Sequence, residues 1–95
     1  PAGLVLATTM AVALATAHIV ETLKALRREG VGFLDSPPVT YYEAVAQRIP
    51  QLEESLAELE TLGILVDGKP NQGYLLQIFT RNVVGPFFFE VIQRK

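Results

Sequence analysis

Two apolar, β-prone runs near the end of the sequence limit its fold more than any other feature. They read YLLQIFT at 74–80 and FFFEVIQ at 87–93. A shorter run at 64–67 precedes them, and the six residues that follow it are rich in Gly, Pro and Asn, which predicts a β-hairpin. Because a sheet must bury at least one face, these strands need a layer of helices from the same short chain.

A helix and a further strand are predicted upstream of the hairpin. Residues 18–29 place apolar side chains on one stripe and charged side chains on another, and Gly30 follows at a position typical of a helix end. The short apolar run at 31–34 predicts a strand. The DSPP segment at 35–38 then predicts an extended loop, since proline restricts the residue before it.

Two more short helices are predicted between this loop and the hairpin. Thr40 followed by Glu43 has the spacing of a capping box, which predicts a helix over 41–48. After Pro50, four leucines recur at helical spacing as far as Gly63. This segment also carries four glutamates that we expect on a solvated face: Glu53, Glu54, Glu58 and Glu60.

The first 20 residues are the most ambiguous part of the sequence. Their only ionisable side chain is His18, and about 20 apolar residues would just span a bilayer. The Ala-Thr-Ala triplet at 15–17 also resembles a signal-peptidase site. Against both interpretations, the segment has no basic residues and no initiator methionine, and the amphipathic pattern begins at His18 without a break. We therefore expect a buried strand and no membrane segment.

Composition limits the classes of function. The 95 residues predict a single domain, 1–95, in which hydrophobic residues form 49% and charged residues 19%. The net charge is −2 and the eight basic residues are dispersed, which argues against a nucleic-acid partner. The absence of cysteine excludes disulfides and thiolate metal ligands, and it fits a reducing, cytoplasmic location. A domain so small and apolar is expected to need a partner.

The last two apolar runs each contain a polar side chain that could take part in chemistry, and the strand period of two predicts which residues share its face. Glu90 is a lone carboxylate in the middle of an aromatic strand, and burying it unpaired would cost several kcal/mol. It therefore either binds a cation or metal, or points to solvent, or pairs with Arg81 or Arg94. Gln77 shares a predicted face with Leu75 and Phe79, where it is either a hydrogen-bonded buried amide or an edge residue.

Several segments are similar to one enzyme family. GVGFLDSPPVTYYEAVAQRIP at 30–50, LAELETLGILVDG at 56–68, GYLLQIFT at 73–80 and GPFFFEVIQRK at 85–95 resemble the C-terminal part of 4-hydroxyphenylpyruvate dioxygenases. Hydroxymandelate synthases are relatives, and the group is the vicinal-oxygen-chelate proteins. The resemblance covers about 10–95 and leaves residues 1–9 unassigned. It implies an α+β fold, a βαβββ module with extra short helices inserted before the last three strands.

The resemblance also implies a site. Members of the family hold Fe(II) with two histidines and one glutamate and oxidise an aromatic 2-oxo acid in tyrosine catabolism. Carried over by residue, Glu90 stands at the metal ligand, and Gln77, Phe79 and Phe88 stand at positions that line the substrate pocket.

The sequence departs from the family at one ligand. Ala11 stands where the resemblance places a histidine, and the other histidine belongs to a module outside this chain. His18 falls at the start of a helix, where it is not expected to substitute. We therefore expect no iron to be bound by this chain alone. Two hypotheses remain: part of a dioxygenase whose missing ligands come from elsewhere, or a non-catalytic, truncated, degenerate or engineered scaffold that self-associates.

The same module architecture predicts an uncovered apolar sheet face. A single βαβββ module covers one face of its sheet with helices, so the other face should recruit a second copy or a second module. The residues expected on this face are Ala11, Ala13, Leu75, Phe79, Phe88 and Ile92.

Overall fold

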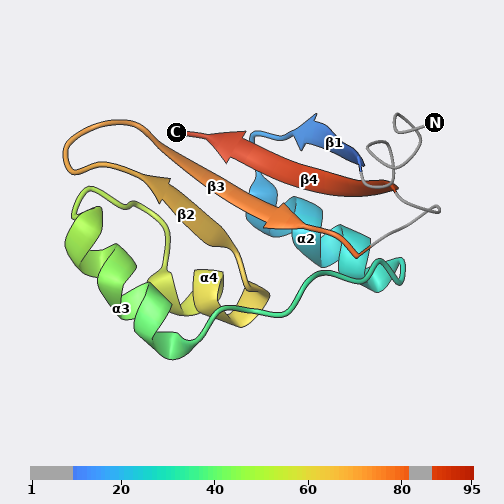
Figure 1. Ribbon diagram of the computed structural model, residues 1–95, viewed down its shortest axis with the longest axis horizontal. Helices are drawn as coiled ribbons and strands as arrows, with labels where there is room; N and C mark the ends of the chain where they lie inside the picture. The colour runs from blue at the N-terminus through green and yellow to red at the C-terminus, as the bar shows by residue number, and fades with distance from the viewer. Residues whose placement is uncertain (1–9, 82–86) are drawn as a thin grey trace, which may run out of the picture.

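The structure is a computed structural model that describes residues 10–81 and 87–95. Three helices and a four-stranded sheet confirm the mixed architecture expected from the sequence (Figure 1). In chain order the elements are β1 Met10–Ala15, α2 Ile19–Arg28, α3 Val39–Arg48, α4 Leu56–Leu62, β2 Leu65–Gly68, β3 Tyr74–Phe79 and β4 Phe87–Arg94. The predictions that concern residues 1–9 lie outside the described residues.

The strands form one mixed sheet in the order β1-β4-β3-β2. β1 runs parallel to β4, whereas β2, β3 and β4 are antiparallel neighbours. The predicted hairpin is present as β2 and β3. Its turn needs unusual backbone at Asn71, with φ 61°, and at Gly68, with φ 158°, where a Cβ would lie 2.7 Å from the Cβ of Tyr74. The glycine therefore lets the two strands begin their pairing at a tight turn.

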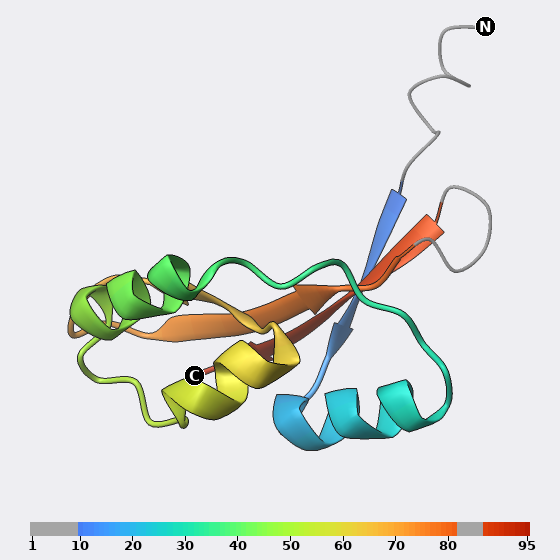
Figure 2. The ribbon, with the colours of Figure 1, turned by 90° about the horizontal axis from the view of Figure 1, so that it is seen from below.

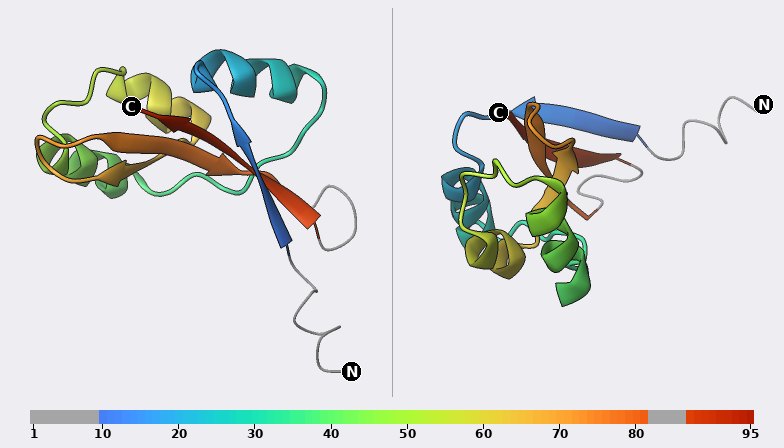
Figure 3. Two further views of the ribbon diagram at one scale, coloured as in Figure 1. Left: turned by 90° about the horizontal axis from the view of Figure 1, so that it is seen from above. Right: turned by 90° about the vertical axis from the view of Figure 1, so that its left-hand side faces the viewer.

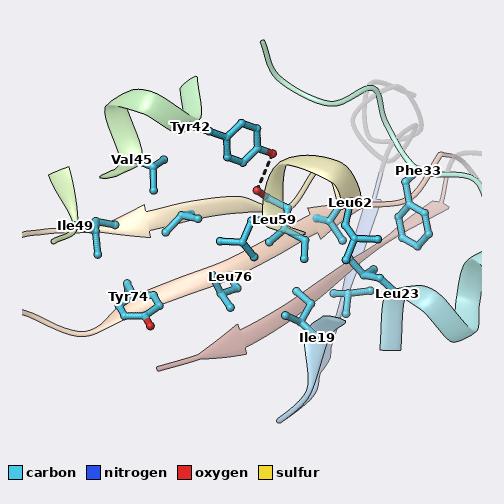
Figure 4. Packing of buried hydrophobic residues seen from close by; sticks show 14 residues of the cluster. Ile19, Leu23, Phe33, Tyr42, Val45, Ile49, Leu59, Leu62, Tyr74 and Leu76 are labelled. Atoms are coloured by element: carbon cyan, nitrogen blue, oxygen red, sulfur yellow. Dashed lines mark hydrogen bonds between the residues drawn. The ribbon is translucent and has the colours of Figure 1, made fainter. Parts of the chain in front are cut away.

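Among the described residues, the helices cover one face of the sheet and leave the other uncovered. α2 and α4 lie together against one side of β3 and β4, and α3 lies alongside β2 (Figures 2 and 3). The core between helices and sheet is built from side chains that are almost fully buried (Figure 4). They include Leu23, Val45, Ile49, Leu59, Ile64, Val66, Leu76, Ile78 and Val91. Burying this apolar surface is the main favourable term in the stability of the fold.

The predicted strand at 31–34 is wrong. Only one isolated bridge forms, between Phe33 and Thr80, with hydrogen bonds from Leu34 N to Phe79 O and from Arg81 N to Gly32 O, both 3.0 Å. Phe33 instead turns into the core, with the Arg27 guanidinium 4.8 Å from its ring centroid. The segment acts as a cover over the core, and the following prolines end its pairing.

The helix starts were the least accurate predictions. Thr40 does not cap α3, which begins at Val39 after Pro38 and has no side-chain cap hydrogen bond. The leucine-rich helix begins at Leu56 rather than after Pro50, because Ser55 Oγ accepts a hydrogen bond from Glu58 N at 3.3 Å. The Ser-x-x-Glu spacing was the correct signal for that start.

The N-terminal predictions are partly confirmed. The helix expected at 18–29 is α2, with His18 as its N-cap residue and Gly30 at φ 89° beyond its end. The strand is present as β1, but the expected burial is wrong, because Ala13, Leu14 and Ala15 are exposed. β1 is an edge strand, so only one neighbouring strand shields it. None of the described helices is long and apolar enough to cross a bilayer.

Glu54 departs from the solvated face predicted for it. Its side chain is only 16% exposed, and it accepts hydrogen bonds from Tyr74 Oη at 2.7 Å and Lys95 Nζ at 2.9 Å. Burial alone would raise the pKa of Glu54, but these hydrogen bonds outweigh burial and hold the pKa below its usual value. The Glu54 carboxylate therefore links the segment that precedes α4 to Tyr74 at the start of β3 and to Lys95 after the end of β4.

Candidate functional site

The uncovered sheet face brings the four candidate residues together. Glu90 on β4 pairs with Phe79 on β3 and with Ala13 on β1, so the three positions lie side by side across the sheet. Because paired residues of neighbouring strands point the same way, and alternate residues share a face, Gln77 and Phe88 lie on this face too. The opposite face, which the helices cover, carries Leu76, Ile78 and Val91 of the core.

An aromatic pair forms the centre of this face. The rings of Phe79 and Phe88 meet edge to face, with centroids 6.0 Å apart and planes at 64°. Gln77, two residues from Phe79, pairs with Ile92 on β4 and with Leu65 on β2. Phe79, Phe88, Gln77 and Glu90 are all half-buried. The face therefore combines an apolar floor with one amide and one carboxylate.

The alternative ion pairs proposed for Glu90 do not form. Arg81 donates instead to Asp35 Oδ1 at 2.8 Å. Arg94 pairs in register with Leu75, four residues along β4 from Glu90. Within residues 10–81 and 87–95, no cationic side chain lies within 4 Å of the Glu90 carboxylate. Glu90 is half-buried at this face, and among the described residues it has no cationic partner.

The register also locates the position at which the family resemblance expects a histidine. Ala11 pairs with Phe88, and Ala13, two residues further along β1, pairs with Glu90. Position 11 is therefore diagonal to Glu90 across neighbouring strands, a spacing that long side chains can bridge. An alanine at this position has no lone pair for a metal.

His18 lies outside this arrangement. It is the exposed N-cap residue of α2, beyond the end of β1, and its backbone N–H donates to Thr16 Oγ1 at 3.0 Å. The described part of the chain contains no group of three or more His, Cys, Asp or Glu side chains that could hold a metal ion. A site built from two histidines and a glutamate does not fit the residues at this face, where Glu90 is a lone metal-ligating side chain among the described positions.

Two hollows lie away from Glu90. One, of about 500 Å³, is at the hairpin end of the sheet between Gly68, Tyr74 and Arg94. The other, of about 410 Å³, is between the start of α2, Glu58 and Lys95. The face around Glu90 is open because no second layer lies over it among the described elements. A cavity at Glu90 would need a wall from another module, which sequence reasoning had already predicted.

The chain is similar to known proteins over most of its length. It is 51% identical over 86 residues to a 4-hydroxyphenylpyruvate dioxygenase of Legionella pneumophila and 49% identical over 85 residues to one of Pseudomonas aeruginosa. These matches cover 88% of the chain, which spans about a quarter (24%) of those relatives. No protein-family model matches the chain.

The chain is also similar to solved structures of related proteins. The chain matches 4-hydroxymandelate synthase from Streptomyces coelicolor, in a triple-mutant form, with a TM-score of 0.68 and 33% identity. It matches a fusion of a xylose isomerase-like TIM barrel and 4-hydroxyphenylpyruvate dioxygenase with a TM-score of 0.75 and 32% identity. Both matches cover 90% of this chain, and they cover 23% and 14% of the respective solved chains.

Proposed function

Because this chain is homologous to part of the 4-hydroxyphenylpyruvate dioxygenases and shares the vicinal-oxygen-chelate fold with them, we propose that its open sheet face is one wall of a dioxygenase-type site. In this proposal Glu90 supplies the carboxylate ligand of that site. Gln77, Phe79 and Phe88 form the surface against which an aromatic 2-oxo acid binds. A second module, in another copy or in a longer chain, supplies the opposite wall.

The observation that carries the proposal is the register around Glu90. Glu90, Phe79 and Ala13 lie in one row across three strands, and Phe88 packs its ring against that of Phe79. An aromatic substrate gains affinity from edge-to-face contact with such rings. The Gln77 amide offers both a donor and an acceptor to a polar substituent. The resemblance alone named these residues, whereas the pairing pattern supports a shared role for them.

The incomplete ligand set limits what this chain does by itself. A non-haem Fe(II) centre of this type uses two histidines and one carboxylate. Among the described positions at the face, only Glu90 has a ligating side chain, and Ala11 offers a methyl group. We propose that the chain alone does not bind iron tightly and does not turn over a substrate. We also propose a cytoplasmic location, which suits a chain without cysteines.

Metal titration of paired variants tests this proposal. Isothermal titration with Co(II) and Zn(II) compares the original chain, Ala11→His, and the double variant Ala11→His with Glu90→Gln. We expect undetectable binding for the original chain, measurable binding for Ala11→His, and a loss of about tenfold or more when Glu90 is also changed. If Ala11→His binds no better than the original chain, position 11 does not face Glu90 and the proposal fails.

A second candidate function is favoured by Ala11 itself. A module that has lost a ligand can persist as a non-catalytic scaffold that binds another module. Oxygen consumption with 4-hydroxyphenylpyruvate, measured for the chain with and without added Fe(II), separates the two. The dioxygenase-wall proposal expects Fe(II)-dependent uptake by Ala11→His at a concentration where it associates and none by the original chain, whereas the scaffold hypothesis expects no uptake by either.

A further inference from the structure

A hollow at the hairpin end of the uncovered sheet face has charged side chains on both sides of one leucine. Its volume is about 500 Å³. Leu75 of β3 pairs with Asp67 of β2 on one side and with Arg94 of β4 on the other. Because paired residues of neighbouring strands point to the same face, the three side chains lie in one row with the leucine in the middle. Two strand spacings, about 10 Å, separate the backbone positions of Asp67 and Arg94.

The charged side chains of the hollow are free of partners among the described residues. Five of the eight basic side chains take part in hydrogen bonds or ion pairs: Lys24, Arg27, Arg48, Arg81 and Lys95. Within residues 10–81 and 87–95, Arg28, Lys69 and Arg94 take part in none, and the last two line the hollow. The Asp67 carboxylate likewise has no partner in this part of the chain. Unpaired charges of both signs therefore face one small space.

Backbone contacts hold the walls of the hollow in place. On the hairpin side, Gln51 Nε2 donates hydrogen bonds to Lys69 O at 2.9 Å and to Gln72 O at 2.7 Å, which fixes the turn that carries Lys69. On the other side, a Cβ at Gly73 would lie 2.9 Å from Lys95 O, so the glycine permits the close approach of the two strand ends. The hollow is therefore preformed, and a ligand would not have to order its walls.

We propose that this hollow binds an ω-amino carboxylate, a molecule with a carboxylate and an ammonium group at the two ends of an apolar chain. The planar Arg94 guanidinium holds the carboxylate through two parallel hydrogen bonds. The Asp67 carboxylate accepts a hydrogen bond from the ammonium group, and Leu75 contacts the apolar chain. The proposal rests on this row of residues and not on Glu90 or a metal, so it goes beyond the proposed function.

The row itself selects this class of ligand. Its unlike charges lie at opposite ends, so a molecule with only one kind of charge would pair with only one of them. Their separation excludes an α-amino acid as a bridge, because its ammonium and carboxylate groups are attached to the same carbon atom. Leu75 favours an apolar chain between the two ends, since burying apolar surface is favourable. Lys69 adds a second positive charge at the rim, so the carboxylate end should contribute more to affinity than the ammonium end.

A titration of the original chain followed by amide NMR shifts tests the proposal. The probes are 6-aminohexanoate, hexanoate and hexylamine, which share an apolar chain and differ in their charged ends. Because Asp67, Lys69 and Arg94 are exposed to water, we expect 6-aminohexanoate to bind with a dissociation constant of about 1 mM at low ionic strength. Hexanoate should bind about threefold more weakly and hexylamine about tenfold more weakly, since each lacks one charged contact.

The position of the shifts and the order of the probes both decide the outcome. The amides that shift should be those of the residues that line the hollow, at 67–69, 73–75 and 94–95. Shifts centred on Phe79 and Glu90 would place the probe elsewhere on the sheet and would overturn the proposal. So would equal affinities for 6-aminohexanoate and hexanoate, or no saturable shift with any probe.

Three variants identify the side chains that bind. Arg94→Gln should weaken 6-aminohexanoate binding by about fivefold or more, because a charge-assisted pair is lost. Asp67→Asn should weaken it by about threefold and should not weaken hexanoate binding, because only the ammonium group contacts Asp67. The matched control is Arg28→Gln, which removes another exposed guanidinium without a partner among the described residues, on α2, and should leave the affinity unchanged.

The variants also separate a specific site from the effect of net charge. All three positions are exposed, so the variants should fold, and an unchanged urea midpoint checks this. Equal weakening by Arg28→Gln and Arg94→Gln would mean that only the net charge of the chain matters. That result, or an unchanged affinity in Arg94→Gln, would overturn the proposal.

Discussion

Truncating the two neighbouring leucines of β3 tests which side of the sheet carries the candidate site. Leu76 is fully buried in the core beneath the helices, whereas Leu75 is half-buried on the face that carries Gln77 and Phe79. The substitutions Leu76→Ala and Leu75→Ala remove the same atoms from adjacent residues of one strand. Any difference in stability between them therefore comes from the face on which each side chain lies.

The expected magnitudes differ severalfold. Removing a fully buried leucine side chain costs the lost transfer free energy and leaves a cavity, about 3 to 4 kcal/mol in a site as enclosed as that of Leu76. Leu75 leaves no enclosed cavity, so its truncation should cost about 1 kcal/mol. A domain of 95 residues has a total unfolding free energy of about 5 to 14 kcal/mol. Leu76→Ala therefore removes a large share of it.

Urea denaturation followed by circular dichroism measures both changes. With an m value of about 1 kcal/mol per molar urea, the midpoint should fall by about 3 M for Leu76→Ala and by about 1 M for Leu75→Ala. The protein is kept dilute, because association would add to the apparent stability. Equal losses, or a greater loss for Leu75→Ala, would mean that the faces of β3 are exchanged and that the candidate residues face the helices.

Three further outcomes are expected. Phe89→Ala should cost about 1 to 2.5 kcal/mol in urea denaturation, less than a fully buried phenylalanine, because Phe89 is half-buried; a loss above about 4 kcal/mol would contradict this. Glu90→Gln should change the unfolding free energy by less than about 0.5 kcal/mol without metal, and a large loss would reveal a partner for the carboxylate. Because the pKa of Glu54 is lowered in the folded protein, its ionised form stabilises the fold above the unfolded carboxyl pKa, and this contribution is lost as the pH falls through the lowered value. The stability difference between the original chain and Glu54→Gln should accordingly shrink on acidification below the usual value of 4.5, and a difference that grew would refute the assignment.

The candidate face was predictable because it depends on local alternation. Once β3 and β4 are strands, the period of two places Gln77 with Phe79 and Phe88 with Glu90. The register between the strands then decides that Glu90 meets Phe79, and the hairpin and loop lengths alone do not fix that pairing. The family resemblance named the candidate residues and the period of two predicted which of them share a face, but the register between the strands came from the structure.

Contacts between distant segments account for what the sequence did not reveal. The 31–34 segment has strand composition, but Phe33 packs into the core with the Arg27 guanidinium over its ring, and only an isolated bridge to Thr80 forms. Tyr41 appeared as an ordinary helix residue, and its pairing with Val66 depends on where α3 lies beside β2. Glu54 shares the composition of a solvated face, and only the approach of Tyr74 and Lys95 buries it.

The parallel pairing of β1 with β4 has a consequence for how the chain folds during synthesis. The start of α2 is held by Gln93, whose Oε1 accepts a hydrogen bond from Ile19 N at 2.8 Å across 74 residues of sequence. At about 5 to 20 residues per second, a ribosome needs roughly 4 to 15 seconds to make the intervening chain. Throughout that interval the apolar β1 segment has no native neighbour. Newly made β1 therefore stays without a sheet partner until β4, the last strand of this sequence to be made, is available.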